Sequence, residues 1–283
     1  RSALGGVMKS ALLQLNVSDD PRANLPVTVA MVRDAAAQGA HFVLTPEVTN
    51  CLSTSREHQR GVLQFEEGDI TLAALREVAS DTGIWLLIGS LALKTEDDDG
   101  RFANRSFLIA PDGSVAAQYD KIHMFDVQIT ESETYRESAG YRPGTQAVVV
   151  QTSFAKLGMS ICYDMRFPLL YQALATAGAQ ILTAPAAFSP VTGAAHWHAL
   201  LRARAIETGC FVLAPAQTGT HASKNHKTRD TYGHSLVVDP WGEVILDAKT
   251  EPGVYIFDLN MEKGEVARQK VPSLANRRSF SDP

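Results

Sequence analysis

Apolar residues follow two spacings along this chain, one typical of buried strands and one typical of helices. Short apolar runs predict strands, which lie at residues 9–17, 41–47, 84–93, 102–110, 114–119, 156–162, 180–185, 211–217, 234–239, 243–248 and 253–259. Apolar residues near every third or fourth position predict helices, which lie at residues 23–40, 70–82, 168–178, 195–208 and 260–269. Turn-forming sequences, 111-PDG-113 and 240-PWG-242, each join two of the strands.

Helices alternate with apolar strands, and hairpins join some of the strands. This order predicts an α/β fold in which helices cover a mixed sheet. Two mixed sheets packed face to face would accommodate this many strands, but periodicity does not distinguish that arrangement from one large sheet. The chain contains no long Pro/Ser/Gly linker and no fixed-period repeat, so residues 8–283 are expected to form one domain. Residues 1–7 precede a methionine that opens the first strand, and we interpret them as a cloning remnant or a loose extension.

Composition narrows the classes of function. The 283 residues are 45% hydrophobic, which is enough for a sizeable core. The net charge is −5 and charges of both signs are interspersed, which argues against a nucleic-acid partner. The chain contains no apolar run of the length that a membrane span requires, so no membrane partner is expected. The acidic run 96–101 is expected to be a solvated hairpin tip.

Three cysteines, Cys51, Cys162 and Cys210, lie far apart and outside any CxxC spacing. Their number and spacing argue against a disulfide framework and a structural zinc site, and favour a reducing, cytoplasmic setting. Cys210 lies in the apolar run 209-GCFVLA-214 and is expected to be a core residue, whereas Cys51 is compatible with either a core or a functional position.

Cys162 differs because it ends an apolar strand and begins a charged turn, 162-CYDMR-166. Functional sites of α/β sheets are built at the carboxyl ends of strands, where a nucleophile can meet free backbone N–H groups. A thiol needs a base or a cation to become a nucleophile, and none of the eight histidines is singled out by its spacing. Glu47 and Lys121 follow two other predicted strands, so the three groups could share one site.

Several segments together resemble the carbon–nitrogen hydrolases of the nitrilase superfamily over nearly the whole chain. The segments are 43-VLTPE-47, 119-YDKIHMFD-126, 158-GMSICYDMRFP-168, 192-TGAAHW-197, 202-RARAIE-207, 232-YGHSLVVDPWG-242 and 272-PSLANRR-278. The resemblance is strongest to the amidase branch that includes deaminated glutathione amidase and omega-amidase. Nitrilases themselves follow the nucleophile with Trp-Glu, whereas Tyr163 and Asp164 follow it here.

The resemblance implies an α-β-β-α sandwich, which usually pairs into a dimer, so a homodimer or higher homo-oligomer is expected. It also implies a role for five residues. Glu47 would be the general base, Cys162 the nucleophile and Lys121 the cation that stabilises the oxyanion. The backbone N–H of Tyr163 would be the second oxyanion donor, and Glu137 would orient Lys121 or the leaving amine. This chemistry needs no metal and no organic cofactor.

Other residues are candidates for contacts with the small-molecule amide substrate: Arg166, Phe125, Phe188 and His123. Arg166 could bind a substrate carboxylate bidentately, or it could pair with Asp164 in a structural role. The segment 218–234 could be a mobile surface loop, or its cations could attract an anionic substrate; these are Lys224, Lys227 and Arg229. His198 and Leu169 stand where this branch usually has glutamate, so the sequence departs from the branch at these two positions.

The sequence therefore predicts a thiol amidase that hydrolyses a C–N bond of a small carboxylated substrate through a cysteine thioester. Deaminated glutathione is the first substrate expected, and an omega-amidase acting on α-ketoglutaramate or α-ketosuccinamate is the alternative. Two hypotheses of other classes stay open. One is a non-catalytic binding or scaffold protein on the same fold, and the other is a redox sensor that pairs Cys162 with Cys51 or Cys210.

Overall fold

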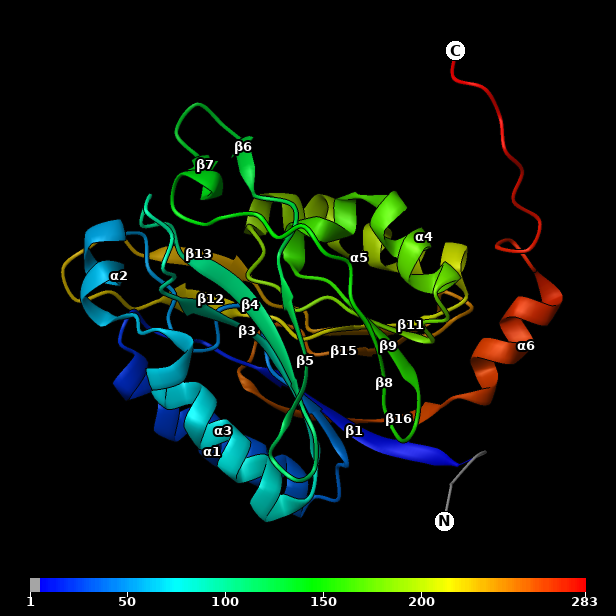
Figure 1. Ribbon diagram of the computed structural model, residues 1–283, viewed down its shortest axis with the longest axis horizontal. Coiled ribbons are helices and arrows are strands. Elements are labelled where there is room, and N and C mark those ends of the chain that lie inside the picture. Colours follow the sequence, from blue (N-terminus) through cyan, green and yellow to red (C-terminus); the bar gives the residue numbers. More distant parts are fainter. Residues whose placement is uncertain (1–5) are drawn as a thin grey trace.

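The structure, a computed structural model, describes residues 6–283, which form two six-stranded mixed sheets packed face to face with helices outside them (Figure 1). The first sheet has the order β16 (Gly253–Asn260), β1 (Val7–Gln14), β2 (Phe42–Leu44), β3 (Trp85–Leu93), β4 (Ala103–Ile109), β5 (Val115–Asp120). The second has the order β15 (Val244–Asp247), β14 (Leu236–Val238), β11 (Phe211–Ala214), β10 (Ile181–Thr183), β9 (Lys156–Met159), β8 (Val149–Gln151). The expected α-β-β-α sandwich is confirmed.

Helices cover the outer face of each sheet (Figure 1). On the first sheet these are α1 (Pro21–Ala37) and α3 (Ile70–Thr82), and on the second α4 (Pro168–Thr176) and α5 (Pro190–Thr208). Smaller elements complete the chain: α2 (Arg56–Val62), the hairpin of β6 (Asp126–Gln128) and β7 (Thr134–Arg136), the hairpin of β12 (Thr218–His221) and β13 (Arg229–Tyr232), and α6 (Glu262–Lys270). Among the residues described, no helix has the length and apolar character needed to cross a membrane.

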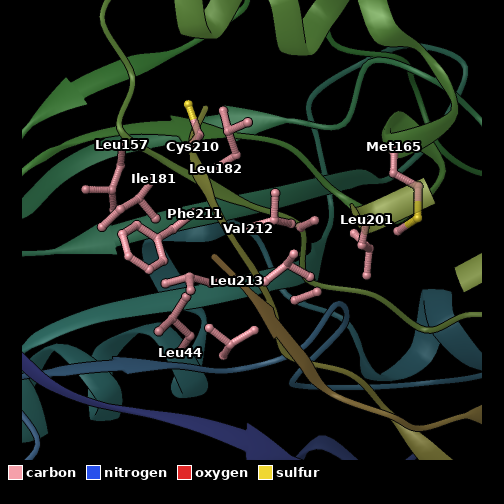
Figure 2. Close-up of a cluster of buried hydrophobic side chains, with 14 of the residues drawn as sticks. Leu44, Leu157, Met165, Ile181, Leu182, Leu201, Cys210, Phe211, Val212 and Leu213 are labelled. Carbon is pink, nitrogen blue, oxygen red and sulfur yellow. The ribbon is translucent and has the colours of Figure 1, made fainter. Parts of the chain in front are cut away.

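Successive side chains of a strand point to opposite faces of its sheet, so each central strand contributes to two buried layers. In β1, Leu12 belongs to the cluster between the sheets, whereas Ala11 and Leu13 belong to the cluster beneath α1 and α3. Figure 2 shows the first of these clusters, in which Leu44 of β2 lies with Phe211 and Leu213 of β11. Both faces of the central strands are therefore buried, which explains why these strands read as continuous apolar runs.

The strands that precede the candidate site run in the same direction within each sheet. β2 and β3 are parallel, β4 reverses, and β5 reverses again, so β2 and β5 end at the same edge of the first sheet. In the second sheet β9 and β10 are parallel and end together. Glu47 and Lys121 follow β2 and β5, and Cys162 follows β9, so each of the three lies beyond the carboxyl end of a strand.

The predicted elements agree with the structure except at some boundaries. The helix predicted at 70–82 has those bounds, because Asp69 caps its first turn and Gly83 ends it at φ 67°. The helix predicted at 195–208 begins earlier, at Pro190, since proline is tolerated in the first turn of a helix. The strand predicted at 156–162 ends at Met159, and a 3-10 helix begins at Cys162.

Local pattern did not indicate every element. The segment 218–234, interpreted as a possible mobile loop, forms the β12–β13 hairpin, and α2, β6, β7 and β8 were not predicted. The acidic run 96–101 does lie at the connection between β3 and β4, where most of its side chains are exposed. Of the expected extension 1–7, residues 1–5 lie outside the described residues, and Val7 already belongs to β1.

Candidate active site

A cavity of about 660 Å³ opens at the carboxyl ends of the strands. Its walls come from both sheets, from the β6–β7 hairpin and from residues 187–191 and 227–230. Seven of the nine residues expected to act in catalysis or to contact the substrate amide line it: Glu47, Lys121, Phe125, Glu137, Cys162, Tyr163 and Phe188.

Lys121 lies between two carboxylates in this cavity. Its Nζ is 2.9 Å from Oε1 of Glu47 and 2.9 Å from Oε1 of Glu137. The Lys121 side chain is 1% exposed, so the ammonium group is almost wholly removed from water. Glu137 is held in turn by the backbone N–H of Phe125, which donates to its Oε1 at 2.9 Å. A buried lysine with two carboxylate partners is a cation fixed in place.

Hydrogen bonds from two distant segments orient the Glu47 carboxylate, and a third segment holds its backbone. The side-chain amide of Asn104 on β4 donates to Oε1 at 2.9 Å, and the backbone N–H of Ala187, beyond β10, donates to Oε2 at 2.9 Å. Gln217 donates to the backbone carbonyl of Glu47 at 3.0 Å. Asn104 and Gln217 were not identified from the sequence, because nothing in a lone amide side chain indicates that it faces a carboxylate from another strand.

The charges of this cluster oppose the effect of burial on the pKa values of Glu47 and Lys121. Burial by itself raises the pKa of Glu47, but the charge and hydrogen bond of Lys121 outweigh it and lower the pKa below its ordinary value. Burial likewise works to lower the pKa of Lys121, and the charges of Glu137 and Glu47 outweigh it and raise that pKa. At neutral pH, Glu47 is therefore an ionised carboxylate and Lys121 a cation.

Cys162 sits at a strained turn. Its backbone has φ 49°, an uncommon value for a residue other than glycine, and its N–H donates to the carbonyl of Pro185 at 2.9 Å. Burial raises the pKa of the Cys162 thiol well above its usual range, the Glu47 carboxylate raises it further, and Lys121 works in the opposite direction. The resting thiol is therefore protonated, beside a carboxylate that can accept its proton.

Asp164 joins the turn of Cys162 to the loop of Lys121. Its fully buried carboxylate accepts hydrogen bonds from the backbone N–H of Ile161 at 2.9 Å, the hydroxyl of Tyr119 at 2.6 Å and the backbone N–H of His123 at 3.0 Å. The first of these donors immediately precedes Cys162, and the other two flank Lys121. Asp164 therefore ties the Cys162 turn to the Lys121 loop, and it does not itself line the cavity.

Two of the residues expected to contact substrate, Arg166 and His123, do not line the cavity. The ring of His123 stacks on Phe167 with centroids 3.6 Å apart, and its Nδ1 lies 2.7 Å from Asp164. The Arg166 guanidinium lies over the Phe188 ring and 3.2 Å from Nδ1 of His196, and it forms no ion pair with Asp164 in the described chain. Arg166 is the last residue of the 3-10 turn that begins at Cys162, whereas His123 lies in the loop between β5 and β6.

The three cations of segment 218–234 also differ in whether they line the cavity. Arg229 and Lys227 line the cavity, whereas Lys224 does not. The Arg229 guanidinium lies over the Tyr135 ring and donates from Nη2 to the carbonyl of Ala187 at 2.7 Å. Within residues 6–283, its buried Nε has no hydrogen-bond partner. An unsatisfied donor of a cation in the cavity wall is available to an anionic group.

The other two cysteines differ in their surroundings. Cys210 is fully buried and its thiol donates to the carbonyl of Ala179 at 3.2 Å, so the expectation of a core residue is confirmed (Figure 2). Cys51 contributes to the cavity wall, but burial and the nearby carboxylates of Asp19 and Asp20 raise its pKa to about 12. All three cysteines are free thiols.

Comparison with known proteins places this arrangement in a family. The carbon-nitrogen hydrolase model matches residues 9–269. A deaminated glutathione amidase of Synechocystis is 38% identical over 95% of this chain and 97% of its own length. The mouse omega-amidase NIT2 is 37% identical, over 95% of this chain and 94% of its own.

Among solved structures, the NitFhit protein of C. elegans superposes with a TM-score of 0.88 at 34% identity. The superposition covers 97% of this chain and 66% of that protein, so this chain spans about two thirds of its length. The resemblance found in the sequence is confirmed, and the chain belongs to the carbon-nitrogen hydrolase family.

Proposed function

We propose that this protein is a thiol amidase that hydrolyses a C–N bond of a small carboxylated amide through a thioester on Cys162. The observation that supports the proposal is the convergence of four groups in one cavity: Cys162, a lysine held between Glu47 and Glu137, and the lysine's two carboxylate partners themselves. An amide is a poor electrophile, so its cleavage needs a strong nucleophile together with a fixed positive charge where the oxyanion develops. This cluster supplies both.

In the first half of the reaction, the thiol proton of Cys162 passes to Glu47 as the sulfur attacks the carbonyl carbon. The carbonyl oxygen becomes an oxyanion, which Lys121 and the backbone N–H of Tyr163 stabilise. As the intermediate collapses, the C–N bond breaks and Glu47 gives its proton to the leaving nitrogen, which departs as an amine or ammonia. The product that stays on the enzyme is a thioester of Cys162.

In the second half, Glu47 takes a proton from a water molecule, which attacks the thioester carbonyl. The same two donors stabilise the second oxyanion, the C–S bond breaks, and the thiolate regains the proton from Glu47 as the carboxylic acid leaves. Glu137 keeps Lys121 in place throughout. A base that is ionised at rest suits both halves, since each begins with a proton transfer to Glu47.

The substrate we propose first is deaminated glutathione. Three observations support it: a cavity large enough for a peptide-like molecule, the unpaired Nε of Arg229 in its wall, and relatives that carry this activity in their names. A carboxylate at the far end of the substrate would satisfy Arg229 while the amide carbonyl lies at Cys162. The similarity to the mouse omega-amidase keeps α-ketoglutaramate and α-ketosuccinamate as the alternative.

We further propose that residues 8–283 act as one catalytic domain, and the family match over residues 9–269 supports this. A homodimer or higher homo-oligomer is supported by large apolar side chains that are exposed around α4 and α5, notably Leu169, Ile206 and Trp241. The three free buried thiols suit a reducing compartment such as the cytoplasm.

The proposal is tested by measuring product formation from deaminated glutathione and α-ketoglutaramate side by side, with Cys162→Ala as the control. The expected result is turnover that favours the peptide-like substrate and is absent in Cys162→Ala. A preference for α-ketoglutaramate would assign the protein to the omega-amidases. Turnover that persists undiminished in Cys162→Ala would overturn the mechanism itself.

Experiments on the parent protein also distinguish the amidase from the two hypotheses of other classes, the scaffold and the redox sensor. A non-catalytic scaffold predicts no product from any small amide and no acylated Cys162 by mass spectrometry. A redox sensor predicts a disulfide between Cys162 and Cys51 or Cys210 after mild oxidation, which peptide mapping would detect. The amidase predicts a trapped thioester on Cys162 when substrate is mixed with the enzyme and the reaction is quenched with acid.

A further inference from the structure

We propose that His198, His234 and Asp247 form a binding site for one divalent metal ion of the Zn²⁺ type, outside the catalytic cavity. The three residues come from α5, from the segment that leads into β14, and from the end of β15. None of them lines the catalytic cavity, and the amidase reaction proposed above makes no use of them.

The donor atoms of the three side chains converge. Nε2 of His198 lies 2.9 Å from Oδ2 of Asp247, and Nδ1 of His234 lies 3.0 Å from Oδ1 of the same carboxylate. One ligand atom from each residue can be chosen so that all of them lie within 4.8 Å of one another. Two imidazoles and one carboxylate are a donor set that suits Zn²⁺ and related transition metals.

These separations are close to those a metal ion requires. Tetrahedral Zn²⁺ binds nitrogen and oxygen at about 2.0–2.2 Å, so neighbouring ligand atoms lie roughly 3–3.5 Å apart. The distances from the two imidazoles to the Asp247 oxygens are already near that value. The chosen ligand atoms lie within 4.8 Å of one another, and small side-chain rotations would bring them to the separation that the metal requires. With three protein ligands the fourth position would be left to water.

The surrounding contacts hold His234 in place without occupying its ring nitrogens. Its backbone N–H donates to the carbonyl of Lys249 at 2.6 Å, and its own carbonyl accepts from the indole N–H of Trp197 at 2.9 Å. Its ring stacks on Tyr232, with centroids 4.4 Å apart and planes at 22°. A ligand that is oriented before the metal arrives loses less entropy on binding.

The site is open enough for an ion to enter. The side chains of His198, His234 and Asp247 are 36%, 19% and 15% exposed. Lys249 is the one unfavourable feature that we find near the site in the described chain, because its Nζ lies 3.5 Å from Oδ2 of Asp247 and competes for the carboxylate. The lysine side chain is 73% exposed, so it can turn into solvent when a cation binds.

The test is a titration of the untagged full chain with Zn²⁺ by calorimetry, in a Cys162→Ala background that keeps metal off the catalytic thiol. One ion per chain is expected. His198→Gln and Asp247→Asn keep hydrogen-bonding groups but remove good ligands, so each should weaken binding by about tenfold or more. Lys249→Gln removes the competing cation and should tighten binding.

His196→Gln is the matched control, since this histidine lies on the same helix and pairs with Arg166 instead of joining the cluster. It should leave the affinity unchanged. Co²⁺ in place of Zn²⁺ should give d–d absorption bands without the charge-transfer band of a thiolate. Equal Zn²⁺ affinity in His198→Gln and the parent, or a thiolate band from Cys51 or Cys210, would overturn the proposal.

Circular dichroism separates a lost site from a lost fold in each variant. Amidase turnover, measured in variants that retain Cys162, should be preserved when His198 or Lys249 is changed. The metal site and the amidase can therefore fail independently of each other.

Discussion

The hydroxyl of Tyr119 donates a 2.6 Å hydrogen bond to Oδ2 of Asp164, and this bond connects the two halves of the candidate active site. Tyr119 precedes Lys121 by two residues at the end of β5, and Asp164 follows Cys162 by two residues after β9. Both side chains are almost completely buried. Burial and the Asp164 charge raise the pKa of Tyr119, so the phenol stays a donor. The bond therefore helps to fix the distance between Cys162 and Lys121.

Replacing Tyr119 with phenylalanine should affect stability and catalysis together. A lost hydrogen bond to a buried carboxylate is expected to lower the free energy of unfolding by about 1.5–3 kcal/mol. The value of kcat should fall more than KM rises, because the groups that act in the transition state are displaced. Urea unfolding and steady-state kinetics measure the two effects. A Tyr119→Phe protein that is less stable but has unchanged kcat would show that Asp164 holds the turn by itself.

The two buried thiols Cys162 and Cys210 should respond oppositely to truncation. Cys162→Ala is expected to stay folded and to lose all hydrolysis, since no other group in the mechanism can form the thioester. Cys210→Ala should keep its kcat and lose about 1 kcal/mol of stability, the scale for removing one small buried group from a core. Thermal unfolding and turnover of the two variants distinguish a catalytic from a packing role. Hydrolysis lost equally in both variants would contradict this assignment.

Lys121→Met should lower kcat by roughly 10²–10³-fold, the scale observed when an oxyanion donor is removed. The substitution keeps the length of the side chain but leaves two carboxylates, Glu47 and Glu137, without their shared cation. Single-turnover kinetics of the thioester-forming step measures the loss. A decrease of less than about tenfold would shift the oxyanion role to the backbone N–H of Tyr163 alone.

The pH dependence of Glu47 follows from the sign of its pKa shift. The pKa of Glu47 is below its ordinary value of 4.5, so the carboxylate stabilises the folded state at pH values above 4.5, and this stabilisation is lost as the pH falls through the lowered pKa. The acid limb of kcat/KM should therefore lie below pH 4.5. In Lys121→Met the limb should move to higher pH, because the cation that lowers the pKa is gone. An acid limb at the same pH in both proteins would contradict the coupling.

A substitution of Gly89 would show how closely the two sheets must approach beneath the site. A methyl group on Gly89 would overlap the backbone carbonyl oxygens of Thr45 and Pro46 and lie 2.6 Å from Cβ of Pro185. Gly89→Ala should therefore destabilise the protein by about 1–3 kcal/mol and lower kcat, because Glu47 and Cys162 depend on these segments.

Gly61→Ala is the matched control for this substitution. Gly61 lies in α2, where an added methyl group meets nothing within 4 Å, so the change should be neutral or stabilise by up to about 1 kcal/mol. Unfolding curves and turnover of the two variants provide the comparison. Equal stability of Gly89→Ala and the parent would show that the segments beneath the site can separate without cost.

Arg229→Gln should lower kcat/KM for carboxylated amides much more than for neutral amides. Loss of one charge-assisted hydrogen bond is expected to lower kcat/KM for a carboxylated substrate by about 10–100-fold. A small neutral amide should be little affected, because it has no group to pair with Nε. Kinetics with the two substrates measures the ratio. An equal decrease for both would mean that Arg229 acts through its bond to Ala187 and thus on Glu47.

The proposed catalytic groups could be located from the sequence because each lies at the end of a recognisable strand. The apolar runs before Glu47, Lys121 and Cys162 placed all three at strand ends, and the family motifs assigned a role to each. The helix at 70–82 and the hairpin at 111–113 also followed from local chemistry, namely a cap residue, a left-handed glycine and a proline turn. These features depend on neighbouring residues, which a sequence displays directly.

Other features depend on which distant segments meet, and only the tertiary structure decided them. Arg166 and His123 were expected to contact substrate, but neither lines the cavity, whereas Arg229 reaches its wall from a hairpin that local pattern did not indicate. Asn104, Gln217 and Tyr119 act through partners 45 or more residues away. Periodicity fixes the face on which a side chain lies, but its partner is fixed by the packing of one sheet on the other.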